Sequence, residues 1–77
     1  MKEENINLKV SNIAAMTGLR LGWDHNSYYG GYRLEERVES GGASTSLFGE
    51  QRRTYGQFIE FLDTLILGLV LKQRVNA

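Results

Sequence analysis

The sequence of 77 residues contains no cysteine and only one histidine. The absence of cysteine excludes disulfide bonds, thiolate nucleophiles and cysteine metal sites, and it is typical of a reducing compartment such as the cytoplasm, where we expect this chain to reside. With a single histidine, a metal site would have to be completed by carboxylates alone. We therefore predict no bound metal and no cofactor.

The chain also has no excess of charge of either sign, because nine Lys and Arg residues balance nine Asp and Glu residues. No global field draws it to nucleic acid or to a membrane surface, so any such binding must be local. The longest apolar run, residues 61–71, contains Asp63 and Thr64 and is much shorter than the roughly 20 residues of a membrane span. The first residues lead into no apolar segment, so we expect no secretory leader and no membrane partner.

A chain of this length forms one domain of marginal stability, since folding at this size hides only about 60% of the surface of the unfolded chain. We expect a single α+β domain over residues 1–77, with residues 1–5 flexible. Helical spacing of apolar residues predicts a first helix over residues 6–17. Its end is indicated by Gly18, which stands where a left-handed residue usually ends a helix. A second helix is expected over residues 54–75, opened by Thr54 and Gln57 at the spacing of a capping box.

Three strands are predicted between the helices, over residues 19–23, 28–39 and 43–48. Asp24-His25-Asn26-Ser27 and Gly41-Gly42 are interpreted as the two turns, so the strands form an antiparallel meander. Gly30 and Gly31 suggest a bulge within the second strand.

The alternating residues of the second predicted strand assign its two faces. One face is expected to point inwards and contains Tyr28, Tyr32, Leu34 and Val38. The other carries charges that we expect to be solvated, namely Arg33, Glu35, Arg37 and Glu39. Because a charged face cannot be buried without cost, both helices should cover the opposite face of the sheet.

Three further residues of this region need a specific assignment. Glu36 falls in the inward row, and since a buried unpaired carboxylate is costly, we expect a bulge or a sheet-edge position there rather than a cation from a partner. Trp23 is assigned, like Tyr32, to the core. Tyr29 points outwards, where an interface role and simple hairpin packing are equally compatible with the pattern.

The predicted second helix has more apolar surface than one small sheet can cover. Phe58, Leu62 and Leu65 belong to the stripe that should face the core. However, Leu67 and Leu71 fall on the opposite side, where a solvent-facing helix stays polar. We therefore predict a homodimer formed through this helix, with the contact residues Ile66, Leu67, Val70 and Leu71.

A second, functional protein partner would meet the outer face of the sheet, at Tyr29 and Arg33. The alternative is a nucleic-acid-binding module whose phosphate contacts are Arg20, Arg33, Arg37, Arg52 and Arg53. Arg52 and Arg53 stand just before a helix N-terminus, where charge and free amides can hold a phosphate. A solvated loop paired with Glu50 is the simpler interpretation, and zero net charge also disfavours the alternative.

Asp24, His25 and the serines at 27, 44 and 46 are the residue types of a hydrolase site. Their spacing favours a turn instead, because no glycine-flanked nucleophile is present and the glycine pairs do not open a helix. We interpret the chain as non-enzymatic, although an enzyme subunit that completes its site from a partner chain is also compatible with the sequence.

Two resemblances bear on this interpretation. The expected order of elements is similar to that of the double-stranded RNA-binding domain, but the lysine-rich start of that family's second helix is replaced here by Arg52-Arg53-Thr54-Tyr55, which disfavours membership. A second resemblance rests on Gly22-Trp23-Asp24, on Tyr29-Gly30-Gly31-Tyr32-Arg33-Leu34, on Phe48-Gly49 and on the helix with Phe58 and Leu62. Over residues 19–69 the chain resembles short uncharacterised proteins encoded by bacterial prophages and conjugative elements.

That resemblance implies a setting and no particular activity. Proteins of such elements often act by binding and occluding another protein. Together with the predicted dimer, it leads us to expect a self-associating interaction module of a mobile element or prophage.

Overall fold

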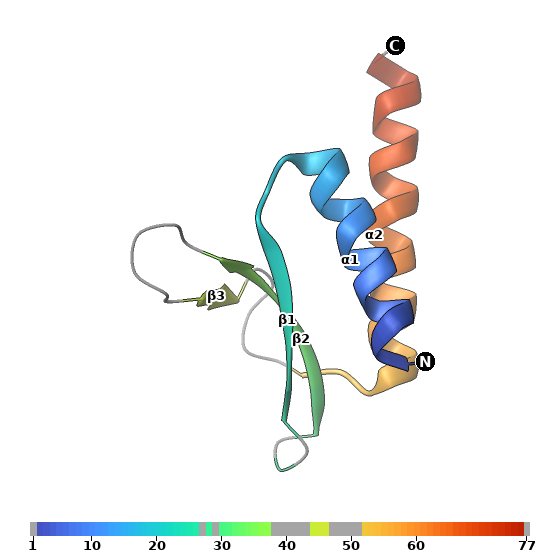
Figure 1. Cartoon of the computed structure of the whole chain (residues 1–77). Coiled ribbons are helices and arrows are strands. Elements are labelled where there is room, and N and C mark those ends of the chain that lie inside the picture. The colour runs from blue at the N-terminus through green and yellow to red at the C-terminus, as the bar shows by residue number, and fades with distance from the viewer. Residues whose placement is uncertain (1, 27, 29, 38–43, 47–51, 77) are drawn as a thin grey trace.

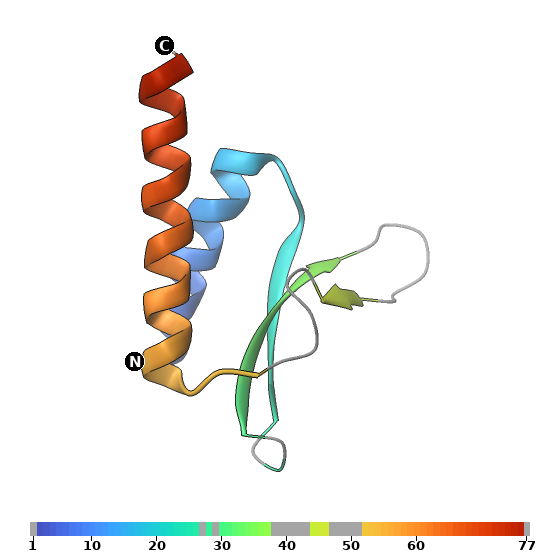
Figure 2. The ribbon, with the colours of Figure 1, turned by 180° about the vertical axis from the view of Figure 1, so that it is seen from behind.

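The computed structural model describes residues 2–26, 28, 30–37, 44–46 and 52–76. The elements follow one another as α1 (Lys2–Thr17), β1 (Leu21–Asn26), β2 (Gly31–Arg37), β3 (Ser44–Ser46) and α2 (Tyr55–Asn76). Figures 1 and 2, which view the molecule from opposite sides, show α1 and α2 side by side on the same side of the β1–β2 hairpin. The two helices run in the same direction, so that both begin at one end of the molecule.

The predicted α+β class and the antiparallel sheet are confirmed. β1 and β2 pair without interruption from Leu21 opposite Glu36 to Asn26 opposite Gly31. β3 is short and pairs antiparallel with residues 35–37 of β2. The other residues of the predicted third strand, 43 and 47–48, lie outside the described residues.

The first helix is longer than predicted, because it begins at Lys2 rather than at Ile6. Residues 2–5, which we expected to be flexible, form the first turn of this helix. Asn5 is held in place by Tyr55, whose hydroxyl accepts a hydrogen bond from Asn5 Nδ2 at 3.0 Å. The end of α1 is as predicted, since Gly18 has a φ of 75° and its amide donates to the carbonyl of Ala14.

The second helix is confirmed together with its start signal. The amide of Gln57 donates to Thr54 Oγ1 at 3.3 Å, and the amide of Thr54 donates to Gln57 Oε1 at 3.2 Å. This is the reciprocal pair of a capping box, which satisfies two amides that the helix itself cannot.

The first hairpin turn lies further along the chain than predicted. Asp24, His25 and Asn26 belong to β1, so their assignment to a turn is wrong. Tyr28, predicted to point inwards from a strand, lies in the turn and is 86% exposed. Gly30 lies in the turn and Gly31 is the first residue of β2, both with positive φ, so the two glycines form no bulge inside the strand.

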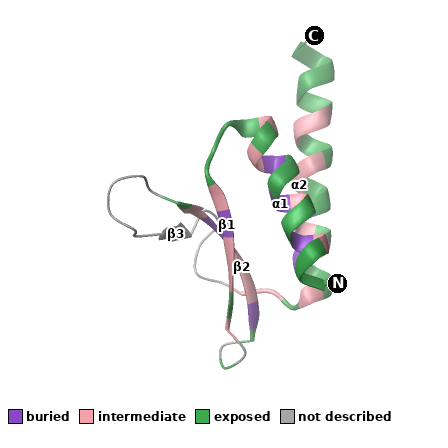
Figure 3. Ribbon diagram, in the orientation of Figure 1, coloured by how far each residue is buried: buried purple, intermediate pink, exposed green. Residues whose placement is uncertain are grey.

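The core lies between the two helices and the helix-facing side of the sheet. Its buried residues are Ile6, Val10, Ile13, Leu34, Phe58 and Leu62. Leu34 is the only one of these that comes from the sheet, so the helices supply most of the interior. Figure 3 shows buried residues in α1, β1 and β2 and the exposed last turns of α2.

An aromatic cluster around Tyr32 joins the sheet to α2. The Tyr32 ring stacks on Phe58, with centroids 5.6 Å apart, and lies 6.0 Å from Tyr55. On the β1 side it lies 5.7 Å from Trp23 and 4.4 Å from His25. Trp23 and Tyr32 thus pack against the core, as predicted.

None of the helices in the described part of the chain is long and apolar enough to cross a membrane.

The start of β2 provides a test of this packing. The amide and carbonyl of Tyr32 both bond to the backbone of Arg53, at 2.7 and 2.9 Å, and a Cβ on Gly31 would collide with the Arg53 carbonyl. We expect Gly31→Ala to lower the free energy of unfolding by about 3 kcal/mol, measured by urea denaturation, through this clash and its positive φ.

Gly30→Ala is the matched control, because Gly30 also has a positive φ but has no atom within 4 Å of the added Cβ. It should cost about 1 kcal/mol. Equal losses in the two variants would contradict the close approach of Arg53 to β2.

Candidate functional site

Charged residues on the sheet face away from the helices form a connected network. Asp24 lies opposite Arg33 in the register of β1 and β2. Arg52 Nη2 donates to Asp24 Oδ2 at 2.6 Å, and Arg52 Nη1 donates to the carbonyl of Gly31 at 3.0 Å. Arg33 Nη2 donates to Glu35 Oε1 at 3.0 Å. Arg52 thereby fastens the segment before α2 to both strands of the hairpin.

The prediction that this face is a solvated row of charges is wrong for Glu35, which is only 7% exposed and is the one charged residue buried among those described. Its carboxylate is compensated by Arg33, as a buried charge requires. Glu36 lies on the helix-facing side, beside Leu34, and is half-buried. The expected bulge or edge position of Glu36 is also wrong, because the pairing of β2 is regular there and Glu36 has strand partners on both sides, Leu21 and Thr45.

The pKa of Asp24 is lowered below its ordinary value, chiefly by the hydrogen bond from Arg52 and then by the positive charges of Arg52 and Arg33. Partial burial acts in the opposite direction and does not outweigh them. Asp24 is therefore an ionised structural anchor at neutral pH. His25 is the next residue of the same strand, so it points to the opposite face, where its ring lies against Tyr32.

Arg52 and Arg53, two of the arginines proposed as phosphate contacts, are engaged within the chain. The side chain of Arg52 is only 11% exposed and is committed to Asp24 and Gly31. The guanidinium of Arg53 lies 4.0 Å from the centroid of the Phe61 ring. Arg37 lies across Gly22. This geometry gives the nucleic-acid alternative no support.

The residues proposed to bind a functional partner are only partly described. Tyr29 lies outside the described residues. The side chain of Arg33 is mostly covered and is paired with Asp24 and Glu35. Sequence reasoning missed this pairing because it ended the first strand at Trp23, which left Asp24 in a turn.

The predicted self-association residues occupy two different environments on α2. Leu67 and Leu71 are 58% and 52% exposed, whereas Ile66 and Val70 are half-buried. Val75, one turn further along, is 83% exposed and was not singled out from the sequence, although it follows Leu71 at the same spacing. We call Leu67, Leu71 and Val75 the outer stripe of α2.

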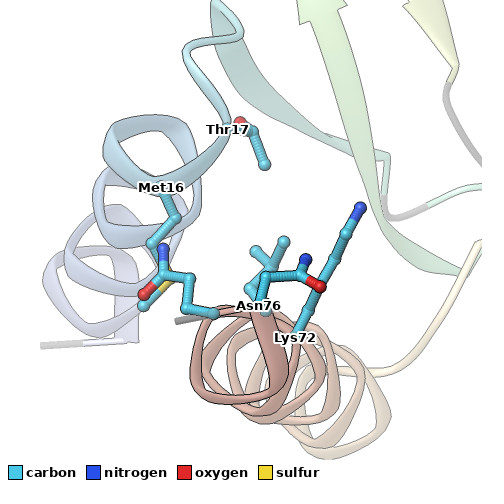
Figure 4. Close-up of a pocket in the computed structure, with 6 residues that line it drawn as sticks. Met16, Thr17, Lys72 and Asn76 are labelled. Atoms are coloured by element: carbon cyan, nitrogen blue, oxygen red, sulfur yellow. The ribbon is translucent and has the colours of Figure 1, made fainter.

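A hollow separates the C-terminal ends of the two helices. Figure 4 shows Met16 and Thr17 of α1 and Lys72 and Asn76 of α2 around a cavity of about 530 Å³. It adjoins a smaller apolar cleft of about 180 Å³ that is lined in part by Leu21, Leu34 and Leu69. The helices and the sheet therefore diverge at this end, and the sheet does not cover the C-terminal half of α2.

No family model matches the chain, and no curated protein or solved structure matches it either. The described residues contain no group of three or more side chains that could hold a metal ion. Half of the large apolar residues exposed in the described chain belong to the outer stripe of α2.

The Asp24–Arg52 pair makes a testable contribution to stability. Because the pKa of Asp24 is lowered on folding, its contribution is complete above the ordinary pKa and is lost as the pH falls through the folded value. Asp24→Asn should therefore be less stable than the parent by about 1 kcal/mol at neutral pH, and the difference should shrink below about pH 4.

Urea denaturation at a series of pH values measures this difference, with Glu4→Gln as a control in an exposed carboxylate of α1. The control should remain within about 0.5 kcal/mol of the parent at neutral pH. A difference between Asp24→Asn and the parent that does not change with pH would contradict the assignment.

Proposed function

We propose that the protein is a non-enzymatic interaction module that self-associates through α2. The observation that carries this proposal is the outer stripe, in which two leucines and a valine lie exposed on the side of α2 turned away from the core. Exposed apolar residues are common singly, but a row of them at helical spacing is typical of an interaction surface.

The strength of such an association can be estimated from the leucines. Covering the exposed half of one leucine contributes about 1 kcal/mol, so the four leucines of two copies contribute about 4 kcal/mol. This matches only the lower end of the roughly 4–15 kcal/mol cost of association, so the valines and the rim residues Ile66 and Val70 must add to it. We expect a reversible dimer whose population depends on concentration.

The rest of the proposal concerns setting and partner. A small accessory protein of a prophage or conjugative element, acting in the cytoplasm, would use the dimer to present the outer sheet face to another protein. The proposed contacts on that face are Tyr29 and Arg33. A non-enzymatic role is supported by the commitment of Asp24 to Arg52 and by the separation of Asp24 and His25 onto opposite faces of β1.

The double variant Leu67→Glu, Leu71→Glu tests the role of the outer stripe. Four glutamates would meet in the contact, so the variant should be monomeric at concentrations where the parent is dimeric, as measured by light scattering. Its circular dichroism should match that of the parent, because neither leucine belongs to the core.

Leu8→Glu is the control, since Leu8 is an equally exposed leucine on α1. It should leave the dimer intact. A parent protein that stays monomeric at high concentration would refute the proposal directly.

A further inference from the structure

We propose that two copies pair with their α2 helices antiparallel, so that Arg74 of each copy lies beside Thr64 of the other and one helical turn from its Glu60. This inference rests on the proposed self-association and adds its orientation and its specificity. In such a pair the second copy covers the outer stripe, so no different protein is needed for that purpose.

The residues on the outer side of α2 follow a coiled-coil spacing. Glu60, Thr64, Leu67, Leu71 and Arg74 are separated alternately by four and three residues, which aligns them in one seam along the helix. The seam spans about 21 Å, given a rise of 1.5 Å per residue. All five residues are exposed. The two leucines occupy its centre, an acidic residue stands at one end and a basic residue at the other.

The charges at the two ends of the seam, Glu60 and Arg74, form no ion pair with another described residue. Asp63, by contrast, is bound to Lys9 of α1 at 2.6 Å, and Lys72 faces the hollow between the helices. Of these four charged residues, only Glu60 and Arg74 therefore lie in the seam.

The charge order selects one orientation. A parallel pair would place Glu60 against Glu60 and Arg74 against Arg74, which is repulsive at both ends. In an antiparallel pair, Leu67 of one copy packs against Leu71 of the other. Arg74 then lies opposite Thr64, one helical turn from Glu60, so both ends are attractive. The helix dipoles also oppose each other in this orientation.

The polar residue within the seam tolerates being covered. Thr64 Oγ1 donates to the carbonyl of Glu60 at 2.8 Å, so its hydroxyl proton already has a partner when a second helix approaches. Arg74 of the second copy can donate to the oxygen of the same hydroxyl.

Charge exchange tests the orientation. Glu60→Arg should weaken dimerisation about tenfold in analytical ultracentrifugation, because it creates two Arg–Arg contacts in an antiparallel pair. Arg74→Glu should weaken it similarly, and the double exchange Glu60→Arg, Arg74→Glu should restore the parent affinity to within about twofold. In a parallel pair, each exchange only replaces one like-charge contact by another, so unchanged affinity in the single variants would overturn the proposal.

Disulfide trapping gives an independent readout, because the chain has no cysteine of its own. A mixture of Thr64→Cys and Arg74→Cys chains should form a mixed disulfide dimer on mild oxidation. Thr64→Cys alone should not cross-link, since its two copies would lie about 15 Å apart along the antiparallel axis.

A Thr64–Thr64 cross-link in a dimeric protein would refute the orientation and leave self-association standing. A protein that neither dimerises nor cross-links would refute both. The two failures are therefore distinguishable.

Discussion

The contacts of Tyr32 hold the two layers of the molecule together. Its ring lies between the rings of β1 and those of α2, and its backbone pairs with Arg53 in the segment that leads into α2. One residue of the central strand thus fixes the position of three other segments. Trp23 extends the connection to α1, because its Nε1 donates to Asn7 Oδ1 at 2.8 Å. The helices are positioned on the sheet through these aromatic contacts as much as through Leu34.

The opposite face of the sheet is held by charge instead of apolar contact. Arg52 joins Asp24 and Gly31, and Arg33 compensates the buried Glu35. Salt bridges at a protein surface contribute little, but here Arg52 and Glu35 are largely withdrawn from water, so removing one partner would leave a poorly solvated charge. The network therefore makes the entry into α2 depend on the hairpin.

Much of the fold could be predicted from local signals in the sequence. The capping box at Thr54 and the glycine at position 18 fixed one end of each helix, because both signals act through backbone groups close by in the chain. The start of α1 could not be predicted, since Asn5 is held by Tyr55, a residue distant in sequence. The hairpin was misplaced because Gly30 and Gly31 are compatible with both a bulge and a turn.

The exposed leucines of α2 could be located from periodicity alone, because only the side of the helix had to be known. The charged network could not be located from periodicity. Whether Glu35 or Glu36 is buried depends on what covers each face of the sheet, and alternation in the sequence defines two faces without saying which is more enclosed.

The adjacency of α1 and α2 has a consequence for how the chain acquires its structure. Asn5 meets Tyr55 and Lys9 meets Asp63 across more than half of the sequence. β1 also packs against α1, but the apolar side of α1 is fully covered only after α2 has been synthesised. Until then the nascent polypeptide presents Ile6, Val10 and Ile13 to its surroundings, and closure of this long loop is the entropic barrier that folding has to cross.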